Sequence, residues 1–207
     1  MSRISERKET GRIEAFSDGV FAIAITLLVL GIKVPIAEDV RLRGGLGSAL
    51  IHLWPHYLAF VTSFATILAM WVNHHRIFTF VLRSDHFFLY WNGLLLMLVT
   101  FLPFPTTVLA EYFMHFDAGV AGTVFAGTQV AVALAFNGLW RYASKNGRLL
   151  GQHVAPTDVD QITRQHRYGP LLYSMAFVLS FLSVGLSVGV CLCLAVFFGF
   201  KGWPSQT

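Results

Sequence analysis

Long apolar runs separated by short polar connections follow one another along the whole chain. An α-helix needs about 20 apolar residues to cross the hydrocarbon core of a bilayer. The runs predict six membrane-spanning helices, at about 14–34, 53–75, 86–110, 118–142, 168–183 and 185–200. Residues 168–200 would be about 50 Å long as one helix, too long for a single crossing, so we place a tight turn near 183–187.

The residues between the runs support this division. Pro35 ends the first run, and Pro103 and Pro105 are expected to kink the third helix. The polar stretch 144–167 is predicted to be the only long connection, and Thr157 begins a helix that continues into the fifth span. The pattern therefore predicts an all-α, polytopic membrane protein with one domain over residues 1–207.

Composition and charge agree with a membrane protein and give its orientation. Only 13% of the residues are charged, whereas soluble domains carry about 25%. The net charge of +4 does not indicate nucleic-acid binding, because the basic residues are scattered between apolar runs. Of the 15 Lys and Arg residues, only Lys33, Arg41 and Arg43 fall on the side opposite the N-terminus. The positive-inside rule therefore predicts that both termini are cytoplasmic.

Polar side chains are predicted to gather where three helices reach the cytoplasmic side. Buried ionisable groups at that depth need partners. The first helix carries Arg12, Phe16, Ser17 and Asp18 there, and the second and fourth helices offer Trp71, His74, His75 and Asn137. We predict a buried hydrogen-bond network of Ser17 and Asp18 with some of these groups, which either fixes how the first helix packs or takes part in gating.

The same residues give little support to enzymatic or metal chemistry. His74 and His75 are adjacent, so they diverge by about 100° on a helix, and no Cys or carboxylate stands beside them at ligand spacing. None of the common nucleophile, metalloprotease or phosphate-loop motifs is present. We therefore predict no metal, no cofactor and no enzymatic activity. A secondary transporter or proton-coupled carrier using Asp18 and the two histidines stays open as an alternative.

An aliphatic stripe runs along the first helix. Ile23, Leu27 and Leu30 recur at i, i+4 and i+7 and so share one face. Thr26 lies about 60° from Ile23 on the helical wheel. From spacing alone, a stripe of this kind is a packing seam, a lipid-facing surface or the wall of a pore.

Several of these residues also resemble the signature of a known family. The run Arg12, Phe16, Ser17, Asp18, Gly19, with an Ala-Ile-Ala-Ile-Thr segment after it, is similar to the first helix of the transmembrane protein 175 potassium channels. The similarity continues along the chain in Trp71, His74 and His75, the 83–85 turn, Asn92 and the 102–105 stretch.

The resemblance implies a prokaryotic plasma-membrane channel that assembles as a homotetramer around its four first helices. Ile23, Leu27 and Leu30 would then form three apolar rings that act as a hydrophobic gate, with Thr26 as a polar ring beside them. An ion inside an apolar ring loses hydration without gaining ligands, so such a gate closes by dewetting. The permeant ion would be K⁺ with weak to moderate selectivity, and Na⁺, Rb⁺ and Cs⁺ are further candidates.

Overall fold

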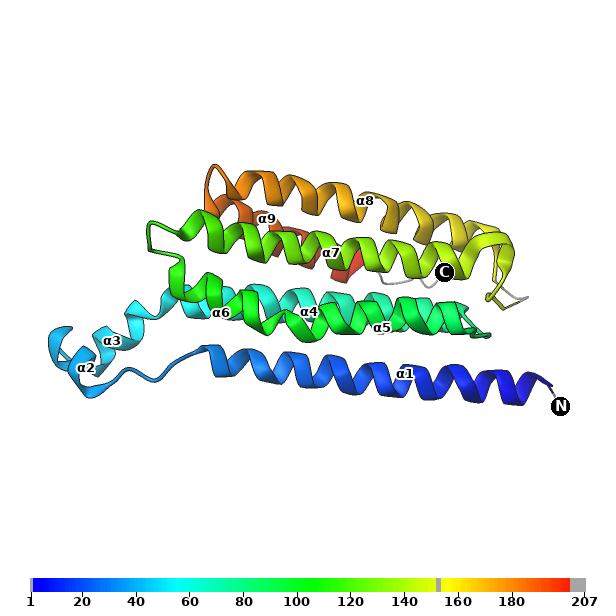
Figure 1. The fold of residues 1–207 in the computed structure, drawn as a ribbon, viewed down its shortest axis with the longest axis horizontal. Coiled ribbons are helices and arrows are strands. Elements are labelled where there is room, and N and C mark those ends of the chain that lie inside the picture. The colour runs from blue at the N-terminus through cyan, green and yellow to red at the C-terminus, as the bar shows by residue number, and fades with distance from the viewer. Residues whose placement is uncertain (1, 152–153, 202–207) are drawn as a thin grey trace.

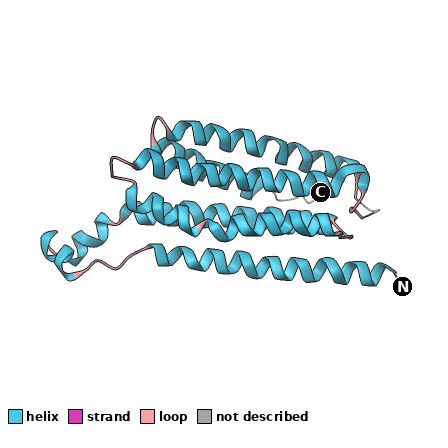
Figure 2. Ribbon diagram, in the orientation of Figure 1, coloured by secondary structure: helices cyan, strands magenta, loops and turns pink. Residues whose placement is uncertain are grey.

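The protein folds into long, nearly parallel helices joined by short loops (Figure 1). The structure is a computed structural model and describes residues 2–151 and 154–201. Figure 2 shows that its regular elements are helices. In chain order they are α1 (Ser2–Leu27), η1 (Leu28–Gly31), α2 (Ala37–Leu42), α3 (Leu46–His52), α4 (Trp54–Phe80), α5 (His86–Phe101), α6 (Pro103–Tyr112), α7 (Ala118–Ser144), η2 (Lys145–Gly147), α8 (Pro156–Ser180) and α9 (Val184–Lys201).

The helices form three layers. Helix α1 lies along one side of the bundle and contacts α4 and α5, whereas α7, α8 and α9 pack together on the opposite side (Figure 1). Helices α4, α5 and α6 lie between these layers. Consequently α1 has neighbours on one face, and its other face is left open in a single subunit.

Four of the predicted crossings are long and apolar enough to span a membrane. They cover Thr10–Gly31, Trp54–Phe80, His86–Tyr112 and Ala118–Gly147. The third is divided at Leu102, where α5 gives way to α6. Pro103 has no N–H to continue the α-helical ladder, and the Val99 carbonyl instead accepts from the Leu102 amide at 3.2 Å.

The C-terminal part is helical over more residues than the hydropathy pattern indicated. Helix α8 begins at Pro156, one residue before the predicted helix start at Thr157 and inside the stretch 144–167 that we predicted as a connection. The chain then turns at residues 181–183, slightly before the predicted 183–187. Ser183 favours this position because its hydroxyl accepts the Leu186 amide at 3.4 Å and so caps α9, the shorter apolar helix.

The connection between α1 and α4 holds two short helices, α2 and α3, that we did not predict. Gly44 and Gly45 separate them with φ angles of 76° and 126°. Residues with a side chain rarely adopt such angles. At the other end of the bundle, residues 149–151 after α7 pair with the segment after α4 through a bridge between Val81 and Leu150.

Candidate functional site

The aliphatic stripe lies on the open face of α1. Ile23, Leu27 and Leu30 are 58%, 39% and 73% exposed in the single subunit. The opposite face is buried against the bundle and includes Phe21 and Leu28. The stripe therefore points away from its own subunit, toward another copy of the chain or toward lipid.

The turn at the end of α1 aligns Leu30 with the other two side chains of the stripe. Leu30 lies in the 3₁₀ turn η1, which follows Leu27 directly. In a 3₁₀ turn, side chains three residues apart eclipse one another, so Leu30 stands nearly above Leu27. Thr26 is exposed on the same side, and its hydroxyl donates to the Ile23 carbonyl at 2.9 Å. Its oxygen thus lies close to the aliphatic side chains.

A relay of hydrogen bonds holds the buried face of α1. The Ser17 hydroxyl donates to the Ile13 carbonyl at 2.8 Å and accepts from the Asn92 amide at 3.0 Å. Because this amide nitrogen donates, the Asn92 carbonyl oxygen is left to accept from His74 Nε2 at 2.9 Å. All three side chains are buried. The relay links α1, α5 and α4 in the apolar interior.

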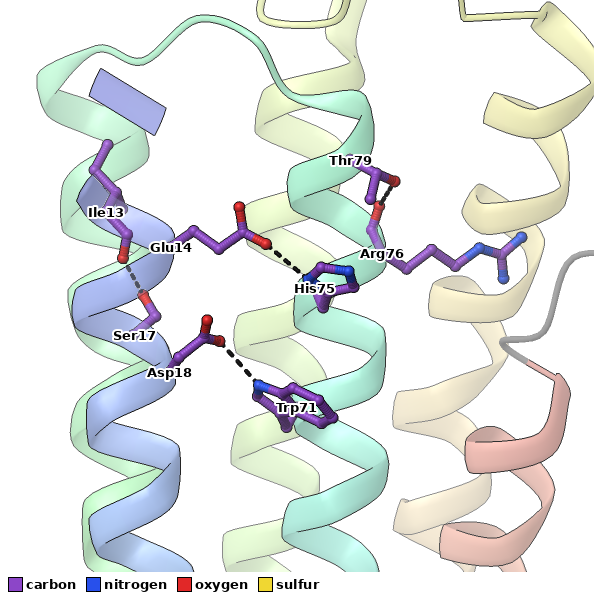
Figure 3. A network of polar contacts seen from close by, with 8 residues as sticks. All are labelled: Ile13, Glu14, Ser17, Asp18, Trp71, His75, Arg76 and Thr79. Atoms are coloured by element: carbon purple, nitrogen blue, oxygen red, sulfur yellow. Dashed lines mark hydrogen bonds and ion pairs between the residues drawn. The ribbon is translucent and has the colours of Figure 1, made fainter. Parts of the chain in front are cut away.

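A second set of contacts joins α1 to α4 near the surface (Figure 3). The Trp71 indole N–H donates to the Asp18 carboxylate at 2.9 Å. One turn further toward the N-terminus, His75 Nδ1 lies 2.7 Å from the Glu14 carboxylate. The Trp71 and His75 rings stack with their centroids 6.2 Å apart. Both carboxylates of this part of α1 therefore have partners on α4.

The other residues that we predicted for the network lie elsewhere. Phe16 is 68% exposed on the open face of α1, and Arg12 is also exposed. Asn137 lies on the far side of the bundle, where its amide donates to the His166 carbonyl at 2.8 Å. The structure thus brings together Ser17, Asp18, Trp71, His74 and His75, but neither Asn137 nor the two exposed residues.

A separate polar cluster fastens α4 to α8. Arg76 points away from α1 (Figure 3) and donates to Gln165 Oε1 at 3.1 Å. The Gln165 amide donates to Asn73 Oδ1 at 2.8 Å, and Asn73 in turn donates to the Ala69 carbonyl at 2.7 Å. The two faces of α4 thereby serve different purposes: one positions α1, and the other positions α8.

Asp85 organises the turn that precedes α5. Its carboxylate accepts the Phe88 amide at 2.9 Å and the Tyr142 hydroxyl at 2.8 Å, and lies 3.4 Å from Arg148. Desolvation alone would raise the pKa of Asp85, but these donors and the Arg148 charge together hold it below its usual value of 3.8. The ionised carboxylate thus caps α5 and ties it to the end of α7.

Two members of the network were missing from our predicted site, Asn92 and Glu14. Asn92 is an isolated amide in an otherwise apolar helix, which by itself signals a buried hydrogen bond. Glu14 lies one turn before Asp18, so both reach α4 from the same side of α1. In the described ranges 2–151 and 154–201, no three His, Cys, Asp or Glu side chains form a group that could hold a metal ion.

Comparisons with known proteins agree with the resemblance. The family model of the endosomal/lysosomal potassium channel TMEM175 matches residues 12–103. A potassium channel of Chamaesiphon minutus is 62% identical over 204 residues, covering 97% of this chain and 98% of the relative. One from Streptomyces collinus is 44% identical over 200 residues, covering 96% of each.

A solved structure extends the agreement to the fold. The crystal structure of a lysosomal potassium-selective channel TMEM175 homolog from Chamaesiphon minutus superposes with a TM-score of 0.88 at 60% identity, covering 95% of this chain and all of that one. The chain therefore belongs to the TMEM175 family, whose members are membrane ion channels and not enzymes.

Proposed function

We propose that this protein is a potassium-permeable channel that conducts through a pore lined by four copies of α1. The observation that carries the proposal is the open face of α1, which presents Ile23, Leu27 and Leu30 while the opposite face is fixed by the bundle. One stripe cannot enclose a path, but cyclic symmetry places identical stripes around an axis. The relatives named as potassium channels support K⁺ as the permeant ion.

The residues of the open face fit such an assembly. Ala15, Gly19 and Ala22 are small and exposed on α1, on the N-terminal side of Ile23. Small residues let neighbouring helices approach closely in a membrane. The aliphatic side chains beyond them would then meet at the axis as three apolar rings and form a hydrophobic gate, which conducts when the rings widen and water enters. Thr26 is the candidate for setting the weak to moderate preference for K⁺ over Na⁺.

The proposed topology has six crossings with both termini in the cytoplasm of a prokaryotic cell. Support comes from the charge distribution. Of the 15 Lys and Arg residues, only Lys33, Arg41 and Arg43, which lie between α1 and α4, fall on the side opposite the N-terminus. Helices α8 and α9 supply the fifth and sixth crossings. A green fluorescent protein fused to the C-terminus should fluoresce, because this reporter matures in the cytoplasm and not after export. A dark but fully expressed fusion would refute the orientation.

Ion flux from liposomes tests the pore. Ile23→Asn should increase K⁺ flux, because a polar ring wets the constriction. Leu171→Asn is the matched control, since Leu171 on α8 is similarly exposed at 65% but lies far from α1. If Ile23→Asn and Leu171→Asn both leave flux and ion preference unchanged, the pore does not run along this stripe.

The alternative is a proton-coupled carrier that uses Asp18, His74 and His75. The structure gives Asp18 and His74 hydrogen-bond partners on neighbouring helices, which suits a positioning role at least as well as ion coupling. Single-channel recording separates the two functions. Unitary currents of about a picoampere correspond to millions of ions per second, far above the turnover of a carrier that changes conformation on the μs–ms timescale.

A further inference from the structure

A groove runs between α8 and α9. These two helices pack on the side of the bundle opposite α1 (Figure 1). The volume of the groove is about 590 Å³, within the range of small-molecule sites. One end is polar and is lined by Asp160, Gln161 and Arg164. The other end is apolar and is lined by Leu172 and Phe197. We call this feature the α8–α9 groove.

The groove crosses the level at which α8 enters the membrane. Before Tyr168 the exposed side chains of α8 include Asp160, Arg164 and Arg167. From Tyr168 onward they are apolar, with Leu171 65% exposed. Tyrosine is typical of the interface between the headgroups and the acyl chains. The polar end of the groove therefore lies among lipid headgroups and the apolar end among acyl chains.

The polar end carries two side chains of opposite charge whose charged groups have no partner among the described residues of the subunit. Asp160 and Arg164 are one helical turn apart on α8, and both line the groove. Within the part of the chain that the structure describes, neither side chain forms a hydrogen bond or ion pair. A guanidinium binds a phosphate through paired hydrogen bonds, and a carboxylate binds an ammonium group.

We propose that the α8–α9 groove binds a phosphatidylethanolamine molecule. Its phosphate lies on Arg164 and its ammonium group on Asp160, while one acyl chain follows Leu172 and Phe197. This headgroup matches both charges. Phosphatidylglycerol has the phosphate but no cation for Asp160, and the quaternary ammonium of phosphatidylcholine has no N–H to donate to the carboxylate.

Native mass spectrometry of the delipidated protein tests the proposal with lipids of identical acyl chains. We expect the first phosphatidylethanolamine to bind about tenfold more tightly, or more, than phosphatidylglycerol or phosphatidylcholine, the difference that one hydrogen-bonded charge provides. Glycerophosphoethanolamine, which has the headgroup without acyl chains, should not bind. Equal affinities for the three lipids would overturn the proposal, as would equally tight binding of the chain-free headgroup.

Substitutions at the polar end assign the two contacts. Asp160→Asn should lower the affinity for phosphatidylethanolamine to that of phosphatidylglycerol. Arg164→Gln should weaken binding of both lipids, and Arg164→Lys should restore it. Arg167→Gln is the control, because Arg167 is equally basic and exposed but does not line the groove. A preference that survives Asp160→Asn, or equal losses in Arg164→Gln and Arg167→Gln, would refute the site.

These positions are exposed, so the variants are expected to fold, and an unchanged elution volume in size-exclusion chromatography verifies it. The lipid site depends on membrane insertion and not on ion conduction. Lipid preference without K⁺ flux would support the lipid site and refute the channel function. K⁺ flux without lipid preference would support the channel function and refute the lipid site.

Discussion

Replacing Asn92 by leucine should destabilise the subunit strongly, because Asn92 is the centre of the relay between α1 and α4. The substitution keeps the approximate side-chain volume but removes the bonds to Ser17 Oγ and His74 Nε2. Each bond contributes about 1 kcal/mol, less where alternative partners exist in the membrane. His74 Nδ1 has no partner among the described residues, so the variant leaves both ring nitrogens of a buried imidazole unsatisfied.

Leaving a buried donor such as the His74 ring N–H without an acceptor lowers the free energy of unfolding by roughly 1–2 kcal/mol more. The expected loss for Asn92→Leu is therefore about 3 kcal/mol. Thr100→Val on the same helix is the control, because among the described residues the Thr100 hydroxyl bonds only to the Leu96 carbonyl of its own helix. We expect that control to change stability by less than about 0.5 kcal/mol.

Unfolding in mixed detergent micelles, followed by tryptophan fluorescence, measures these differences. Ser17→Ala should cost about 1 kcal/mol in the wild-type background, since it removes the acceptor of one relay bond. In the Asn92→Leu background that bond is already absent, so Ser17→Ala should cost less by about 0.5–1 kcal/mol. Strict additivity of the two changes, or an Asn92→Leu cost no larger than that of Thr100→Val, would show that the relay does not stabilise the packing of α1.

Three further changes test other contacts. Gly138→Ala should cost roughly 1–3 kcal/mol, because a Cβ there would stand 2.3 Å from the Trp91 ring; Gly93→Ala, with open space at its Cβ, is the control in the same unfolding assay. Asp85→Asn should lower the melting temperature at neutral pH. Because folding lowers the pKa of Asp85 below 3.8, its contribution is present above that pH and lost as pH falls through the folded value, so the difference should vanish in acid. Thr26→Val should lower the K⁺ to Na⁺ permeability ratio measured from reversal potentials; an unchanged ratio would assign selectivity to the aliphatic rings.

The sequence predicts depth in the membrane better than it predicts neighbours. Hydropathy located the four helices that are long and apolar enough to cross a membrane, since these depend mainly on length and apolar composition. It also located Asp18 and Trp71 at one level, and they do meet. Asn137 lies at a similar level yet bonds to α8, because depth along the membrane normal does not determine which helices are adjacent or how each is rotated.

Two smaller features of the fold were harder to predict, for different reasons. Helices α2 and α3 have six and seven residues, too few to be stable without tertiary contacts or to give a clear period in the sequence. The pairing of residues 149–151 with the segment after α4 forms only when the folded bundle brings the C-terminal ends of α4 and α7 together. Neither feature has a local signal comparable to an apolar run of 20 residues.

The distribution of polar contacts along α1 has a consequence for the proposed gate. Apolar packing of Phe21 and Leu28 is not directional, so it tolerates rotation of the helix about its axis. The bonds of Ser17 and Asp18 are directional and lie about 15 Å from Leu27, taking 1.5 Å per residue. A rotation equivalent to one residue, about 100°, would turn the stripe away from its present direction. We therefore expect the polar network to fix which face of α1 is open.

Asn92→Leu should for this reason alter K⁺ flux although Asn92 lies outside the stripe. Loss of the relay frees α1 to rotate, so the aliphatic side chains meet less closely and flux should rise severalfold, while Thr100→Val should conduct like the wild type. The liposome assay at a temperature well below the unfolding transition measures this directly. Reduced stability with unchanged flux would mean that the network only holds the helices together. Raised flux in Asn92→Leu alone would mean that it also sets the closed state of the gate.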